Sequence, residues 1–186
     1  MSTEVPETLQ ETKECFLLQC AFGSRIEDYK ALSMDKVTVS ADGIPYLRYL
    51  PQKTLKSNEH KDEVEIPIVR YALDIIKKWQ FNFPILKYVT GKSGYNVKIR
   101  KLLEHCQIDR EVRIFDEKSS ENIYNPLYSM GSSKICRKTH IDMLTKVQVN
   151  MYVSGHHKEG SNAVKHYSSL SLKDRFILMS AAYKQP

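Results

Sequence analysis

Long hydrophobic runs are missing from this sequence. No stretch of the 186 residues approaches the roughly 18 apolar residues that a membrane span requires. The start, Met1 to Glu14, is acidic and polar and lacks the basic-then-apolar layout of a secretory signal. We therefore expect a cytoplasmic protein with no membrane partner.

Cysteine is also scarce. The four cysteines form no CxxC pair, and three of them stand in apolar, helix-like segments where a reduced thiol packs as a small hydrophobic group. We expect neither a disulfide nor a structural zinc site. Cys136 and His140 share a predicted helix, but no third and fourth ligand stand at a matching spacing. We interpret both as core residues.

The length and the charge narrow the possibilities further. A chain of 186 residues with 41% hydrophobic content can bury a full core but leaves little room for two domains. We therefore expect one domain over residues 1–186. The 28 Lys and Arg residues against 22 Asp and Glu give a net charge of +6, which favours an anionic partner without identifying it.

The hydrophobic spacing predicts a mainly α fold with a small three-stranded antiparallel β-sheet. Segments 36–40 and 44–50 are β-rich and joined across the turn signal Ala41-Asp42-Gly43, and 64–68 follows a charged loop. Residues 113–131 are polar and contain the turn signal Asn125-Pro126, so they are predicted as a loop. The predicted helices are 6–22, 25–32, 69–79, 95–106, 134–151, 161–167 and 172–183.

Two basic motifs are suited to phosphate. In Gly23-Ser24-Arg25 the glycine permits a sharp turn, so that backbone donors at a helix start and a planar guanidinium can point at one phosphate. In Lys134-Ile135-Cys136-Arg137 the two cations lie three residues apart on one helical face and can contact one anion. The alternatives for Arg25 are a solvated side chain or a pair with Glu27 or Asp28, and the alternative for Arg137 is a solvated basic face.

Two further motifs supply proton-transfer and nucleophilic groups. Lys53 follows a predicted strand, where an ammonium with a depressed pKa can act as a general acid, although Lys56 and Lys61 lie close to it and loop lysines often serve solubility. His156 follows a glycine turn and can bond a phosphate oxygen. Tyr167 carries the one side chain of this region able to attack phosphorus and remain as a stable ester. Most tyrosines, however, only pack.

Taken together, these motifs resemble the catalytic domain of the tyrosine recombinase (phage-type integrase) family along nearly the whole chain. Phe16 to Asp28 is similar to the family's helix that ends in Thr-Gly-x-Arg, and Lys53-Thr54 to its Lys-Thr hairpin tip. Val64 to Ile68 is similar to its Val-x-Ile-Pro strand. Arg137-Lys138-Thr139 resembles its second-arginine segment, and Gly155-His156 its Leu-Gly-His segment. Tyr167 stands where the family has its nucleophile.

The chain departs from this family at two places. Lys134 stands where the family usually has histidine, which leaves open how a proton is transferred at that position. The spacing from His156 to Tyr167 is slightly longer than usual, so His157 is an alternative to His156.

The resemblance implies metal-free, ATP-free DNA breakage and rejoining with no cofactor. Tyr167 would attack a phosphate of double-stranded DNA, giving a 3′-phosphotyrosyl bond and a free 5′-hydroxyl. Arg25 and Arg137 would neutralise the non-bridging oxygens, with Lys134 and His156 as further donors. Lys53 would protonate the leaving oxygen.

In cellular terms the resemblance implies a site-specific recombinase of a mobile genetic element, acting with other protomers in a synaptic tetramer. One alternative is a topoisomerase-like DNA relaxing enzyme. The other is a catalytically impaired DNA-binding module, and the lysine at position 134 is the feature that favours it. The family's N-terminal core-binding domain is missing before Arg25, so we expect a fragment of a longer protein. Its C-terminal helix packs on its own domain or docks into a neighbouring protomer, and the sequence does not decide between them.

Overall fold

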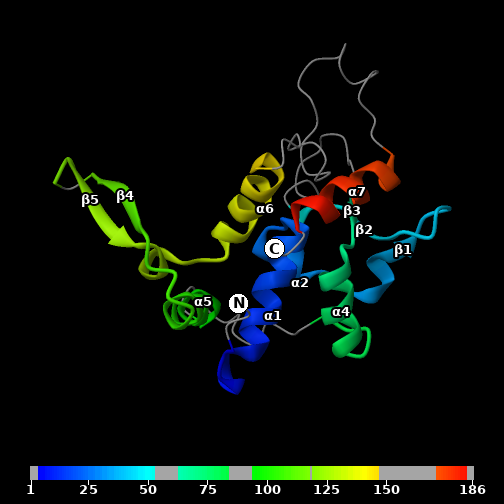
Figure 1. Cartoon of the computed structure of the whole chain (residues 1–186), viewed down its shortest axis with the longest axis horizontal. Helices are drawn as coiled ribbons and strands as arrows, with labels where there is room; N and C mark the ends of the chain where they lie inside the picture. Colours follow the sequence, from blue (N-terminus) through cyan, green and yellow to red (C-terminus); the bar gives the residue numbers. More distant parts are fainter. Residues whose placement is uncertain (1–3, 53–62, 84–93, 118, 147–170, 184–186) are drawn as a thin grey trace, which may run out of the picture.

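The computed structural model describes residues 4–52, 63–83, 94–117, 119–146 and 171–183. This part of the chain is mainly helical, with a three-stranded antiparallel sheet and a two-stranded antiparallel one (Figure 1). The predicted combination of helices with a small three-stranded sheet is therefore confirmed. The elements are α1 (Glu7–Phe22), α2 (Ile26–Lys30), η1 (Met34–Lys36), β1 (Val37–Val39), β2 (Pro45–Tyr49), β3 (Val64–Pro67), α4 (Arg70–Lys78), α5 (Gly94–His105), β4 (Glu111–Asp116), β5 (Glu121–Pro126), η2 (Leu127–Met130), α6 (Lys134–Lys146) and α7 (Leu172–Ala182).

The three-stranded sheet has the order β1-β2-β3, and each neighbouring pair is antiparallel. Val39 pairs with Pro45 across the first turn, where Gly43 adopts a φ of 76° and its N–H donates to the Ser40 carbonyl oxygen at 2.9 Å. A left-handed φ favours glycine because it carries no Cβ. The turn signal Ala41-Asp42-Gly43 thus gave the correct connection.

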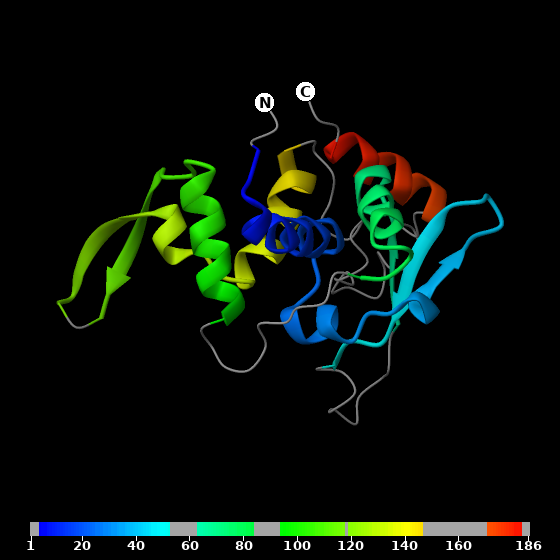
Figure 2. The same cartoon turned by 90° about the horizontal axis from the view of Figure 1, so that it is seen from below.

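Helix α1 runs through the middle of the molecule. In Figures 1 and 2, α5 and the two-stranded ribbon lie on one side of it, and α4 with the three-stranded sheet lies on the other. Leu18 and Phe22 of α1 are fully buried. The same core takes in Leu47 and Ile66 of the sheet, Ile99 of α5, Leu144 of α6 and Met179 of α7. One core therefore joins α1, the three-stranded sheet, α5, α6 and α7.

The C-terminal helix α7 packs on its own domain. Met179 and Ala182 are buried, and the Tyr183 hydroxyl donates to the Cys20 carbonyl oxygen at 2.9 Å. His140 Nδ1 of α6 lies 2.6 Å from that hydroxyl and 3.0 Å from the same carbonyl. His140 and Cys136 are both fully buried, which confirms them as core residues.

The prediction of a loop over 113–131 was wrong. Residues 111–116 and 121–126 pair as a β-hairpin, and 127–130 form the short helix η2. Charged residues on both strands hid the alternation of Val112 and Ile114 that marks β4. The predicted helix 134–151 is confirmed over 134–146, while its remainder and the predicted helix 161–167 lie outside the described residues.

Two features are absent from the described residues. No helix among them has the length and apolar character needed to span a bilayer. They also contain no group of three or more His, Cys, Asp and Glu side chains arranged to hold a metal ion.

Candidate functional site

The turn between α1 and α2 carries the first arginine of the site. Gly23 ends α1 with a φ of 57°, and a Cβ on it would lie 2.6 Å from His140 Cδ2. Both the backbone angle and the contact with the imidazole therefore require glycine. Arg25 then stands as the N-cap of α2 in extended backbone. Because α2 has only five residues, few peptide dipoles are aligned behind Arg25, and the guanidinium supplies most of the positive charge.

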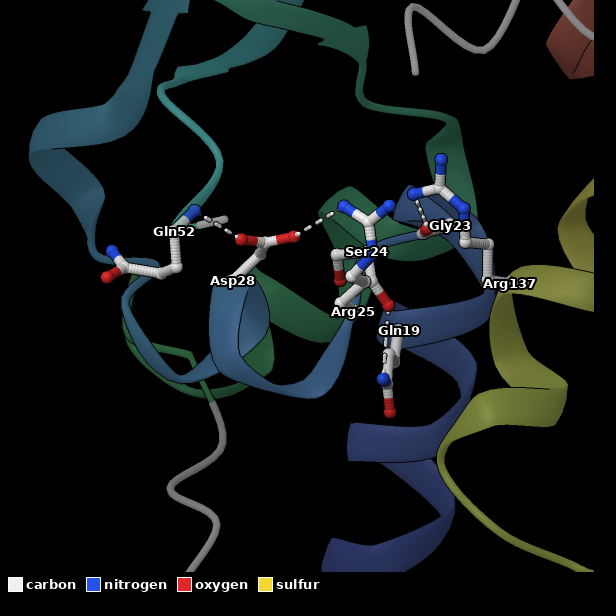
Figure 3. Close-up of polar contacts among 7 residues, drawn as sticks. All are labelled: Gln19, Gly23, Ser24, Arg25, Asp28, Gln52 and Arg137. Carbon is white, nitrogen blue, oxygen red and sulfur yellow. Dashed lines mark hydrogen bonds and ion pairs between the residues drawn. The ribbon is translucent and has the colours of Figure 1, made fainter. Parts of the chain in front are cut away.

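Helix α6 brings the second arginine to the same place. Arg137 Nη1 donates to the Gly23 carbonyl oxygen at 3.2 Å, a bond that joins residues 114 positions apart in sequence (Figure 3). Arg137 is half-buried, whereas Lys134, one helical turn earlier, is exposed. The Gly23 turn thus positions both arginines, one through the chain and one through this bond.

Arg25, Lys134 and Arg137 line one cavity of about 810 Å³. The structure thus brings these three of the predicted site residues to the lining of one cavity. The other lining residues come from the α1–α2 turn, from α2, from the end of β2 and from the start of α6: Ser24, Ile26, Glu27, Asp28, Lys30, Ala31, Gln52 and Ser133.

The electrostatics of this cavity favour an anion. Burial and the nearby charge of Arg25 lower the pKa of Arg137, while Tyr49 and Asp28 oppose this shift. Two guanidinium groups that repel each other are relieved when a negative group lies between them. A phosphate is such a group, and arginine matches its geometry with paired donors.

Asp28 is a site residue whose main role the sequence did not reveal. Its carboxylate is buried, with one oxygen 4.0 Å from Arg25 Nη1 and the other accepting the backbone N–H of Gln52 at 2.7 Å (Figure 3). The pairing of Asp28 with Arg25 was one of the alternatives considered for that arginine. The bond to Gln52 spans 24 residues and has no local signal in the sequence. Asp28 therefore holds Arg25 and the segment that follows β2, at Gln52, in one arrangement.

Gln19 is a second residue that was missed. Its buried Nε2 donates to the carbonyl oxygens of Ser24 at 3.1 Å and Ser133 at 3.3 Å, and its Oε1 accepts from the Tyr95 hydroxyl at 3.2 Å. Ser24 and Ser133 directly precede Arg25 and Lys134. One amide therefore fixes both backbone segments that bring cations to the cavity. In the sequence Gln19 is a single polar residue within an apolar helical segment, and nothing local indicates its contacts.

The chain was compared with known proteins. Comparisons with protein-family models, curated proteins and solved structures found no match. The functional interpretation therefore rests on the residues themselves.

The other predicted site residues lie outside the described part of the chain. These are Lys53, His156 with its alternative His157, and the nucleophile Tyr167. Gln52, the residue before Lys53, lines the cavity.

Proposed function

We propose that this protein breaks and rejoins DNA as a site-specific recombinase of a mobile genetic element, through a 3′-phosphotyrosyl intermediate. One observation carries the proposal: Arg25, which is distant in sequence from Lys134 and Arg137, lines a single cavity with them. The cavity volume of about 810 Å³ exceeds what a lone phosphate fills and leaves room for the neighbouring parts of a nucleotide.

In the proposed reaction the Tyr167 phenol gives its proton to solvent, and the phenolate oxygen attacks a DNA phosphorus atom while the bond from phosphorus to the 5′-oxygen breaks. Lys53 gives its proton to that leaving oxygen, producing a free 5′-hydroxyl. Arg25 and Arg137 neutralise the two non-bridging oxygens as the pentacoordinate transition state forms, and Lys134 adds a further donor. A 5′-hydroxyl from a partner strand then gives its proton to Lys53 and attacks the ester, which releases Tyr167 as a phenolate.

Asp28 and Gln19 support this chemistry without contacting the DNA. A donor stabilises a transition state best when its position is fixed before the reaction. Asp28 fixes Arg25 relative to the end of β2, and Gln19 fixes the backbone before Arg25 and before Lys134.

The proposal is tested by trapping the covalent intermediate on nicked duplexes of random sequence. Cleavage near the nick releases a short fragment that carries the new 5′-hydroxyl. Once this fragment is lost, religation fails and the intermediate accumulates. We expect a denaturation-resistant protein–DNA adduct whose DNA is attached at Tyr167 in peptide mass spectra. Tyr167→Phe should abolish the adduct, while Tyr46→Phe, on β2, should retain it. DNA binding without any adduct would overturn the proposal in favour of a DNA-binding module.

A second readout separates recombination from DNA relaxation. Adducts formed on one duplex are offered a second duplex with a free 5′-hydroxyl, and joined products are sequenced. A recombinase should transfer the strand to the second duplex. Rejoining only within the original duplex, together with relaxation of supercoiled plasmid, would favour a topoisomerase-like enzyme.

A further inference from the structure

A hydroxyl group that makes no hydrogen bond lies at the wall of the cationic cavity. Ser24 lines this cavity with Arg25, Lys134 and Arg137, and its side chain is fully buried. Within the described part of the chain, its Oγ has no hydrogen-bond partner. Leaving a buried hydroxyl unpaired costs free energy, so most such groups in folded proteins are paired. At a cavity wall, an unpaired hydroxyl indicates a hydrogen bond that a ligand completes.

Ser24 stands between the two groups that position the arginines. The carbonyl oxygen of the residue before it, Gly23, accepts from Arg137 Nη1 at 3.2 Å, and the residue after it is Arg25. Its own carbonyl oxygen accepts from Gln19 Nε2 at 3.1 Å (Figure 3). The backbone of Ser24 is therefore held in place beside both guanidinium anchors before any ligand binds.

The charges around the cavity decide which ligand this hydroxyl fits. Both carboxylates of the lining already have partners. Asp28 accepts the Gln52 N–H at 2.7 Å, and Glu27 lies 3.4 Å from the Lys30 ammonium. The two arginines and Lys134 therefore leave the cavity with an excess of positive charge, which attracts an anion.

A serine hydroxyl suits a phosphate among these cations. It donates one hydrogen bond, and a hydrogen bond to a charged oxygen is stronger than one between neutral groups. Serine also has three staggered χ1 positions, so its hydroxyl can turn toward an anion that the arginines hold. Such an anion would give the buried hydroxyl its missing acceptor.

We propose that Ser24 is a ligand of the phosphate that Arg25 and Arg137 bind, donating its hydroxyl hydrogen to a non-bridging oxygen. The inference rests on the proposed function in taking this phosphate to be part of DNA. In the free protein the hydroxyl is an unpaired polar group, and in the bound protein it is a contact. Its removal should therefore weaken phosphate binding without lowering stability.

The test is an NMR titration of the full chain with inorganic phosphate at constant ionic strength. We expect Ser24→Ala to weaken phosphate binding about tenfold, the effect of losing one hydrogen bond to a charged group. Its urea midpoint without phosphate should be unchanged or higher. Thr12→Val is the matched control, because Thr12 is also fully buried with an unpaired hydroxyl but lies on α1, outside the cavity lining. It should bind phosphate like the unchanged protein.

Four results would overturn the inference. These are an unchanged protein that binds no phosphate, a Ser24→Ala protein that binds it as tightly as the unchanged one, a lowered urea midpoint for Ser24→Ala, and equal weakening by Thr12→Val. The titration does not involve Tyr167, so it is independent of the adduct assay. An adduct together with normal phosphate binding by Ser24→Ala refutes this inference alone. Weakened binding by Ser24→Ala without any adduct refutes the proposed reaction alone.

Discussion

Replacing Gly23 by alanine tests how the α1–α2 turn builds the cationic cavity. The φ of 57° alone costs a residue with a Cβ about 1–2 kcal/mol. The new Cβ would also lie 2.6 Å from His140 Cδ2 and 2.8 Å from its Cγ. Relieving such a contact in a packed core costs a further 1–3 kcal/mol or so. We therefore expect Gly23→Ala to lower the free energy of unfolding by about 2–5 kcal/mol.

Gly43→Ala provides the matched control. Gly43 has a φ of 76°, but a Cβ there would meet no atom within 4 Å. Its substitution should cost only the backbone term, about 1–2 kcal/mol. The assay is urea unfolding of both variants at pH 7, followed by circular dichroism, with the slopes compared to check two-state behaviour.

The difference between the two variants is the informative quantity. Equal destabilisation by Gly23→Ala and Gly43→Ala would refute the claim that the imidazole packs against the turn. Because the Gly23 carbonyl also accepts from Arg137, Gly23→Ala should slow DNA cleavage as well, whereas Gly43→Ala should leave the cleavage rate unchanged.

Three more predictions follow from the site and its supports. Arg137→Ala should slow cleavage on the order of a hundredfold while leaving DNA binding largely intact, because the guanidinium acts mainly on the transition state; an unchanged single-turnover rate would contradict this role. Gln19→Leu should lower the free energy of unfolding by about 1–3 kcal/mol in urea, since two buried carbonyl groups lose their donor, and a stability equal to that of the unchanged protein would contradict the bridging role. Burial lowers the pKa of His140 from an ordinary 6.5 to about 4. Between pH 6.5 and pH 4 the imidazole is therefore protonated in the unfolded chain but neutral in the folded protein. The stability this histidine contributes is complete above pH 6.5 and should fall by about 3 kcal/mol as the pH drops toward 4. His140→Gln should flatten that part of the pH profile of the unfolding free energy, and an unchanged profile would contradict the assignment.

The sequence predicted those features that depend on neighbouring residues. Hydrophobic spacing identified α1 and its end at Gly23, and a three-residue turn signal joined β1 to β2. The β4–β5 hairpin escaped prediction because it buries little on either face. Without a buried face, the alternation of apolar and polar residues that reveals a strand is weak.

The site was predictable only in part, for a related reason. Local motifs identified Arg25, Lys134 and Arg137 as candidate site residues, and the structure brings them to one cavity. Gln19 and Asp28 act through backbone groups 5 to 114 residues away, and a single sequence gives no sign of such contacts. Their roles follow from the way the chain folds.

The most direct test of the central claim is a crystal structure of the protein soaked in sulfate. The account predicts one sulfate ion bound between the guanidinium groups of Arg25 and Arg137, with the Lys134 ammonium and the Tyr167 hydroxyl directed at the same ion. Arg25→Ala should empty that position in crystals grown and soaked identically. Arginines that hold separate ions, or a Tyr167 hydroxyl packed in the core away from the ion, would contradict the account.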